Sequence, residues 1–237
     1  MCGGAPFRII GTDDGLIEAP VEATDVLLAP ADRVDVRGGP FEEGRSLDIQ
    51  SLEYNRGLGL KGTAMPFGSV VVGPAQPSVA TVPERLRTIV PIARADAPAR
   101  RDVRSRGRLS LRRGVDFMVN AEPHHHGQPV RVGELQVWNV INETPIDHPF
   151  HLHWFFFPVL EVNGVAPTFN SWEDTVNVPP KSTAKIAWMP DDRPGSWMAH
   201  RDILEHHAAG MMMHFEVIRG QSLQTLEQHD VVDRRRA

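Results

Sequence analysis

Cysteine is nearly absent from this chain of 237 residues, because Cys2 is the only one. A single cysteine excludes an intrachain disulfide and leaves the redox state of the compartment undetermined. No apolar run approaches the roughly 20 residues that a membrane-spanning helix requires, so we expect no membrane partner. Residues 1–7 also lack the charged and then apolar segments of an export signal. The chain as written therefore has no visible route out of the cytoplasm.

An excess of positive charge is also missing, since 25 basic residues stand against 30 acidic ones and the formal net charge is −5. Without a positive field the chain is poorly suited to hold a polyanion, which argues against nucleic acid as a partner. The hydrophobic fraction of 41% and the charged fraction of 23% are ordinary for a globular protein. Disorder along the whole chain is thereby disfavoured.

Glycine and proline, with 20 residues each, punctuate short apolar runs along the sequence. This pattern is typical of an all-β protein. In the segment 184–188, Ala184, Ile186 and Trp188 fall on one face and Lys185 on the other, as in a half-buried strand. The strand candidates are residues 26–28, 34–36, 69–72, 135–141, 185–188 and 215–218.

Residues 83–113 form an Arg-rich stretch with weak periodicity, which we interpret as a linker with a short helix. A basic binding strip is the alternative, but Glu84, Asp96 and Asp102 interrupt the positive charge. We therefore divide the chain near residue 85. The tail after Gly220 is expected to be a frayed helix or disordered.

Histidine clustering is the strongest feature, because seven of the 11 histidines lie between His148 and His214. Residues two apart on a strand point to the same side, whereas residues one or three apart point to opposite sides. His151 and His153 can then share one metal centre while His148 serves another. In the second segment, His200 and Asp202 would face one way and residue 201 the other, with further candidates in the loop beyond, His206 and Met211.

A mononuclear set of His148, His206 and Met211 would offer two imidazoles and one thioether. These are the ligand types of a blue-copper site that lacks its thiolate. The position expected to supply the thiolate holds Arg201, whose guanidinium has no lone pair to donate and would place a positive charge against a cation.

The two histidine segments resemble the HPxHLH and HCHxxxHxxxxM motifs of laccase-like multicopper oxidases. Residues 133–139 and 172–176 resemble two further segments of the family's last domain. Residues 10–13 and 28–33 are similar to the end of its middle domain. By position, the resemblance implies type 1 copper ligands at His148, His206 and Met211, a type 2 ligand at His151, and type 3 ligands at His153 and His200. Arg201 and Asp202 stand where the family has Cys and His.

The resemblance implies two cupredoxin-like Greek-key β-sandwiches. Residues 1–85 would be a partial middle domain, residues 86–220 a complete copper-binding domain, and residues 221–237 a tail. The partial domain would leave sheet edges uncovered, which predicts low stability or a homo-oligomer. The family's activity is the one-electron oxidation of phenols, amines or low-valent metal ions, coupled to reduction of dioxygen to water. Its members are usually periplasmic or extracellular.

The departures from the family pattern predict a damaged site. Arg201 would abolish the type 1 site, and Asp202 can ligate a metal but suits copper less well than imidazole does. The paired histidines of the family's first domain are missing, so activity would need an N-terminal cupredoxin partner. His124, His125 and His126 are interpreted as an exposed turn, with metal ligands as the alternative, and Trp154 replaces the family's usual glycine.

We therefore expect the isolated chain to be inactive as an oxidase. Two alternatives stay open. The chain could be a non-catalytic remnant that binds copper or another divalent metal weakly through its histidines, or a fragment that associates with itself or with another domain.

Overall fold

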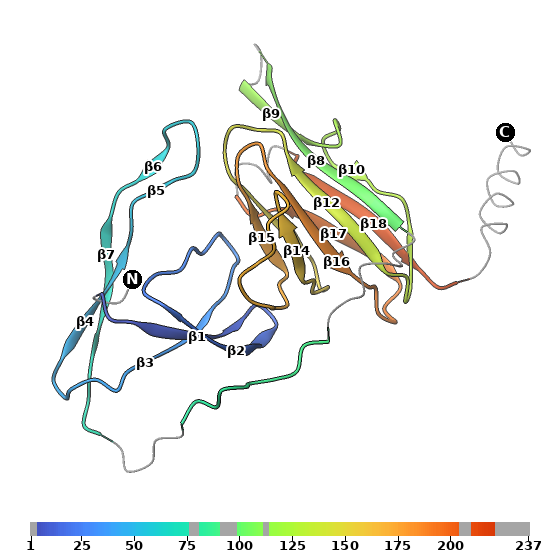
Figure 1. The fold of residues 1–237 in the computed structure, drawn as a ribbon. Helices are drawn as coiled ribbons and strands as arrows, with labels where there is room; N and C mark the ends of the chain where they lie inside the picture. The colour runs from blue at the N-terminus through green and yellow to red at the C-terminus, as the bar shows by residue number, and fades with distance from the viewer. Residues whose placement is uncertain (1–3, 76–80, 91–98, 111–113, 204–209, 221–237) are drawn as a thin grey trace, which may run out of the picture.

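The computed structural model describes residues 4–75, 81–90, 99–110, 114–203 and 210–220. Within these ranges it contains eighteen β-strands and no helix, which confirms the all-β prediction. The described part accordingly offers no helix long and apolar enough to cross a membrane. Figure 1 shows two strand-rich regions side by side, with the described residues 81–90 running as an extended segment between them in the chain.

The first region consists of small, open sheets. A three-stranded sheet has the order β2-β1-β3, β4 pairs with β7, and β5 pairs with β6. Side chains of β3 and β7 are exposed on both faces, and the assignment of this region as a partial domain stays a prediction. The strands are β1 (Phe7–Thr12), β2 (Gly15–Ala23), β3 (Asp35–Gly38), β4 (Ser46–Ser51), β5 (Tyr54–Asn55), β6 (Lys61–Gly62) and β7 (Met65–Val71).

The second region is a complete sandwich of two sheets. One has the order β14-β16-β12-β8-β9, and the other has the order β10-β18-β17-β13-β15 with β11 also paired to β18. The strands are β8 (Ala99–Ser110), β9 (Gly114–Val119), β10 (His125–His126), β11 (Val130–Arg131), β12 (Gln136–Asn142), β13 (His148–Leu152), β14 (Val159–Val162), β15 (Thr175–Val178), β16 (Thr183–Trp188), β17 (Gly195–Arg201) and β18 (Met212–Ile218).

The core of the sandwich is aromatic. Trp138 of β12 packs edge-on against Trp188 of β16 and Phe215 of β18, with ring centroids 5.0 and 5.6 Å away. Ala184, Ile186 and Trp188 are each fully buried, so the period-two pattern of this segment predicted its inward face correctly.

Two sequence interpretations are wrong. Residues 99–110 are not linker but β8, which lies between β12 and β9 in its sheet, and residues 81–90 contain no helix. Buried Val103 and Ser105 alternate with the more exposed Asp102 and Arg104 in β8, and the many charged residues of the stretch hid this alternation. Residues 26–28 form no strand either, because Leu27 and Leu28 lie in a loop with about half of their surface exposed.

Specific contacts join the two regions. Arg33 forms an ion pair of 2.6 Å with Asp174, and the hydroxyl of Tyr54 donates to Asp147 at 2.6 Å. Gly57 bridges to Ile146 with a φ of +104°, and a Cβ there would lie 2.1 Å from the carbonyl oxygen of Pro145. Only glycine fits such a close backbone approach, so the β5–β6 hairpin is held against the base of β13.

Candidate metal centre

Strand pairing gathers three histidines on one face of the sheet. β13 runs antiparallel to β17, and His151 lies directly opposite His200. The neighbouring residues Phe150, Leu152 and Ala199 point into the core, so the histidines point away from it. His153 follows on the same side, and its backbone N–H donates to the carbonyl of Met198. The alternation expected from the sequence therefore holds for these three side chains.

The three imidazoles are close enough to share a metal ion. One potential ligand atom from each of His151, His153 and His200 lies within 4.8 Å of the others. The Nε2 atoms of His153 and His200 are only 2.7 Å apart. Neutral imidazole is a good ligand for copper and zinc. The donor set thus fits a transition metal, and the assignment of these residues as ligands stays a prediction.

The ring of His151 is oriented by its Nδ1 atom. Nδ1 lies 3.0 Å from Thr175 Oγ1 and 3.3 Å from Asp174 Oδ1. Because the Thr175 hydroxyl donates to Asp174, it can accept from an N–H on Nδ1. This arrangement places the ring proton on Nδ1 and leaves Nε2 with the lone pair that a metal would need.

The carboxylate of Asp174 links this ring to the first region. It accepts from Arg33, while the Asp13 carboxylate accepts from the backbone N–H groups of Asp174 and Thr175. Burial alone would lower the pKa of His151, but the hydrogen bond to Asp174 and the charges of Asp202 and Asp174 raise it overall. Burial likewise opposes ionisation of Asp174, yet His151 and Arg33 hold its pKa well below the usual range. The sequence alone did not reveal this network of hydrogen bonds. Two of its members, Asp174 and Thr175, belong to segment 172–176, which indicated only a resemblance to the family.

Asp202 was expected as a substitute ligand. One carboxylate oxygen lies 3.3 Å from Nδ1 of His200, and the other lies 4.0 Å from Nδ1 of His151. These contacts are with the outer nitrogens of the rings, where a carboxylate orients a ligand. Its role as a ligand itself stays a prediction.

On the opposite face of β17, Arg201 is 1% exposed. Its Nε donates to Ser105 Oγ at 2.9 Å and its Nη2 donates to the same oxygen. Its guanidinium carbon lies 5.0 Å from the centre of the Phe150 ring. Burial lowers the pKa of Arg201 to about 9. A buried cation without a free lone pair occupies the thiolate position, so this side of the strand does not fit type 1 copper.

Of the other three residues expected to bind type 1 copper, the structure describes two. His148 and Met211 are fully buried, and the carbonyl of Met211 accepts from the backbone N–H of Arg201. His206 lies outside the described residues. The mononuclear set therefore stays a prediction from the sequence.

Trp154 is a departure from the family pattern that can be judged from its backbone conformation. It follows His153 with a φ of +66° and is 67% exposed. A side chain in this left-handed region is strained, and glycine is not. The family's usual glycine at this position is what the backbone favours. Arg193 compensates in part, because its guanidinium stacks on the Trp154 ring and donates to the Trp154 carbonyl.

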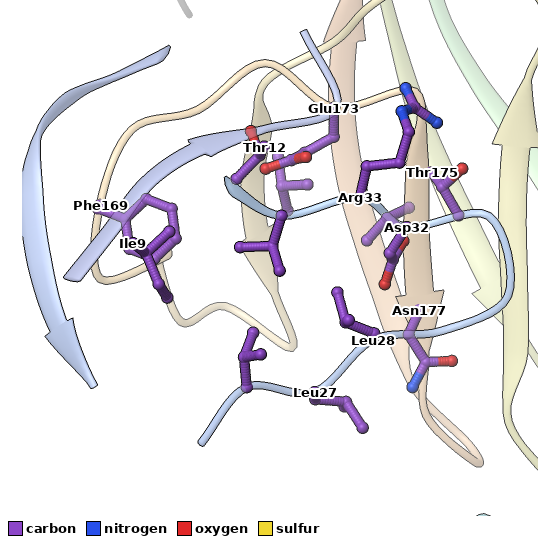
Figure 2. A pocket seen from close by; sticks show the side chains of 14 residues that line it. Ile9, Thr12, Leu27, Leu28, Asp32, Arg33, Phe169, Glu173, Thr175 and Asn177 are labelled. Atoms are coloured by element: carbon purple, nitrogen blue, oxygen red, sulfur yellow. The ribbon is translucent and has the colours of Figure 1, made fainter. Parts of the chain in front are cut away.

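A cavity of about 210 Å³ lies between the loop before β3 and strand β15, and Figure 2 shows the side chains that line it. Leu27, Leu28 and Phe169 line its apolar part, and Asp32 and Glu173 contribute carboxyl groups. Burial raises the pKa of Asp32 to about 6 and that of Glu173 to about 7. The junction of the two regions therefore changes its charge near neutral pH.

The three consecutive histidines are not simply a turn. His124 and His126 are exposed as expected, but His125 and His126 form β10 and pair in parallel with β18. His125 Nδ1 lies 3.0 Å from a carboxylate oxygen of Glu122. Sequence reasoning missed this pairing because a two-residue strand has no periodicity to detect.

Comparisons with known proteins agree with this architecture. A multicopper oxidase from Campylobacter jejuni superposes with a TM-score of 0.80 at 23% identity, over 92% of this chain and 50% of its own. The multicopper oxidase McoA of Aquifex aeolicus has a TM-score of 0.78 at 24% identity, over 90% of this chain and 50% of its own. These likenesses support the cupredoxin fold.

Sequence relatives point the same way. The laccase of Bacillus subtilis is 24% identical over 90% of this chain and 47% of its own length. The multicopper oxidase LPR1 homolog 1 of Oryza sativa is 28% identical over 70% of this chain and 30% of its own length. The chain thus spans half or less of these relatives. Residues 96–221, more than half of the chain, match the multicopper oxidase family model, and the chain belongs to the multicopper oxidase family.

Proposed function

We propose that this chain binds copper through His151, His153 and His200. The observation that carries this proposal is that one ligand atom from each imidazole lies within 4.8 Å of the others. Asp174 and Thr175 hold the outer nitrogen of His151, and Asp202 lies beside that of His200. Such outer contacts fix the tautomer and orientation of a ligand ring.

In a complete multicopper oxidase, bound copper supplies the one-electron oxidation of phenols, amines or metal ions and the reduction of dioxygen to water. This chain would contribute part of that centre, and an N-terminal cupredoxin partner would supply the remaining histidines. The chain spans half or less of the relatives that it matches, so the whole activity is proposed only for the combination with such a partner.

We further propose that the isolated chain is a non-catalytic, copper-binding cupredoxin module. The buried guanidinium of Arg201 replaces the thiolate that would bind type 1 copper. Within the described residues, electrons from a reductant then have no type 1 copper through which to enter. His148, His206 and Met211 are retained as candidates around that position, but their ligand set is incomplete without a thiolate.

Calorimetric titration with Cu(II) tests the binding proposal. The joint replacement His151→Ala and His153→Ala should weaken the affinity by about 100-fold or more, since losing even an outer contact costs about 10- to 100-fold. The matched control is His124→Ala, which removes an exposed histidine elsewhere. An unchanged affinity in the double variant, with the fold intact by circular dichroism, contradicts the proposal.

Oxygen uptake tests the inactivity separately. With copper and a phenolic donor, the purified chain should consume no oxygen above the background of free copper and should lack a blue charge-transfer band. Either signal in the wild-type chain would refute the assignment of Arg201 as a block to electron entry.

Self-association is a second candidate, favoured by the apolar surface of β7. Phe67 is 81% exposed, Val71 68% and Met65 56%, and apolar side chains on an open strand favour pairing with another chain. Light scattering should show an oligomer that Phe67→Ser weakens. A monomer at all concentrations, with no dye binding to apolar surface, removes this candidate.

A further inference from the structure

A second pair of histidines lies on the same face of the sandwich as the candidate metal centre. β10 pairs in parallel with β18, and His126 stands directly opposite His214. The two rings are stacked with centroids 5.9 Å apart and an interplanar angle of 28°. Met213 and Phe215, on either side of His214, belong to the core, so His214 points away from it.

A thioether extends this pair across the sheet. β17 lies on the other side of β18, and Met198 is directly opposite His214. The next residue, Ala199, is in the core, so Met198 shares the outer face with His214. Three adjacent strands therefore carry His126, His214 and Met198 in one row across the sheet.

We propose that His126, His214 and Met198 form a second, surface-exposed site for monovalent copper. Two imidazoles and one thioether are a soft donor set, and a thioether favours Cu(I) over harder divalent ions. His125 is not part of the row, because Glu122 contacts its ring. His126 is exposed, whereas His214 and Met198 are half-buried, and side chains directly opposite each other on neighbouring strands lie close enough to interact.

This site is separate from the histidine cluster but close to it along the sheet. His200 lies two residues beyond Met198 on β17 and pairs with Met212, two residues before His214. An ion bound from solvent by His126, His214 and Met198 would thus lie two residues along the β17–β18 pair from His200. This second site does not depend on copper binding by His151, His153 and His200, because none of these three residues is among its ligands.

Cu(I) affinity can be measured anaerobically by competition with bathocuproine disulfonate. The background should carry Cys2→Ser, because a thiolate would otherwise dominate Cu(I) binding, together with alanine at His151, His153 and His200. This background should keep one Cu(I) equivalent. His126→Gln and His214→Gln should each weaken its binding by about 10-fold or more. Met198→Leu should weaken binding less and remove the copper–sulfur signal from X-ray absorption.

Two matched controls are His124→Gln, next to the row, and Met189→Leu, a methionine 56% exposed elsewhere. Neither should change Cu(I) affinity. If the multiple variant fails to fold, His126→Gln in the Cys2→Ser chain is sufficient, since His126 is exposed, and it should lower the Cu(I) stoichiometry by one. Unchanged affinity and stoichiometry in His126→Gln and His214→Gln, or a bound ion without sulfur scattering in the background protein, overturns the proposal.

Discussion

Replacing the buried Arg201 with methionine should stabilise the protein. Burial desolvates the guanidinium and lowers the pKa of Arg201 from its usual range to about 9. Since each tenfold change in proton affinity is worth about 1.36 kcal/mol, the charged form is disfavoured by about 5 kcal/mol. Its pairing with Ser105 and its position over Phe150 recover part of this. Replacing a buried ion by an apolar side chain typically stabilises by about 1–4 kcal/mol.

Guanidinium chloride unfolding of Arg201→Met should therefore give a free energy of unfolding about 1–4 kcal/mol above the wild type. The control Arg8→Met removes an exposed arginine paired to Glu22 and should change stability by about 1 kcal/mol or less. Because Ser105 is fully buried, a double variant with Ser105→Ala removes any hydroxyl left without a partner. If both Arg201→Met and the double variant are less stable than wild type, the idea of an uncompensated buried cation is refuted.

Three other substitutions test the junction and the backbone. Because the pKa of Asp32 is raised to about 6 in the folded protein, wild-type stability should fall as the pH rises from about 4 to 6. Asp32→Asn should then stabilise by about 1–2 kcal/mol at pH 7.5 but not at pH 4, and equal effects at both pH values in chemical unfolding would contradict this. Trp154→Gly should raise the melting temperature or leave it unchanged, because relief of the left-handed strain, about 1 kcal/mol, offsets the lost stacking; a fall of several degrees would show that the stacking dominates. Gly57→Ala should cost about 2 kcal/mol or more because its Cβ meets Pro145, whereas Gly59→Ala, with open space around it, should cost about 1 kcal/mol; equal losses in urea unfolding would count against a tight hairpin contact.

Alternation along strands was the most informative property of the sequence. It predicted that His151, His153 and His200 share one face and that residue 201 points to the other. A period of two is imposed by backbone geometry and does not depend on the rest of the fold. This is why the histidine face was predictable without coordinates.

Other features depend on contacts between distant segments. The alternation in β8 was hidden because Arg101 lies on the same face as buried Val103 and Ser105. Its parallel partner β12 lies far along the chain, because parallel strands need a crossover connection and cannot be joined by a tight turn. The contact of Arg33 with Asp174 joins residues 141 positions apart. The row of His126, His214 and Met198 likewise exists only through the register of three strands.

Copper is proposed to bind between three imidazoles, those of His151 in β13, His153 directly after it and His200 in β17. Crystals of the wild-type chain soaked with Cu(II) and measured at the copper absorption edge test it most directly. We expect an anomalous peak at coordination distance from nitrogen atoms of His151, His153 and His200. Anomalous peaks that occur only elsewhere, with these three rings free of metal at saturating copper, would contradict it.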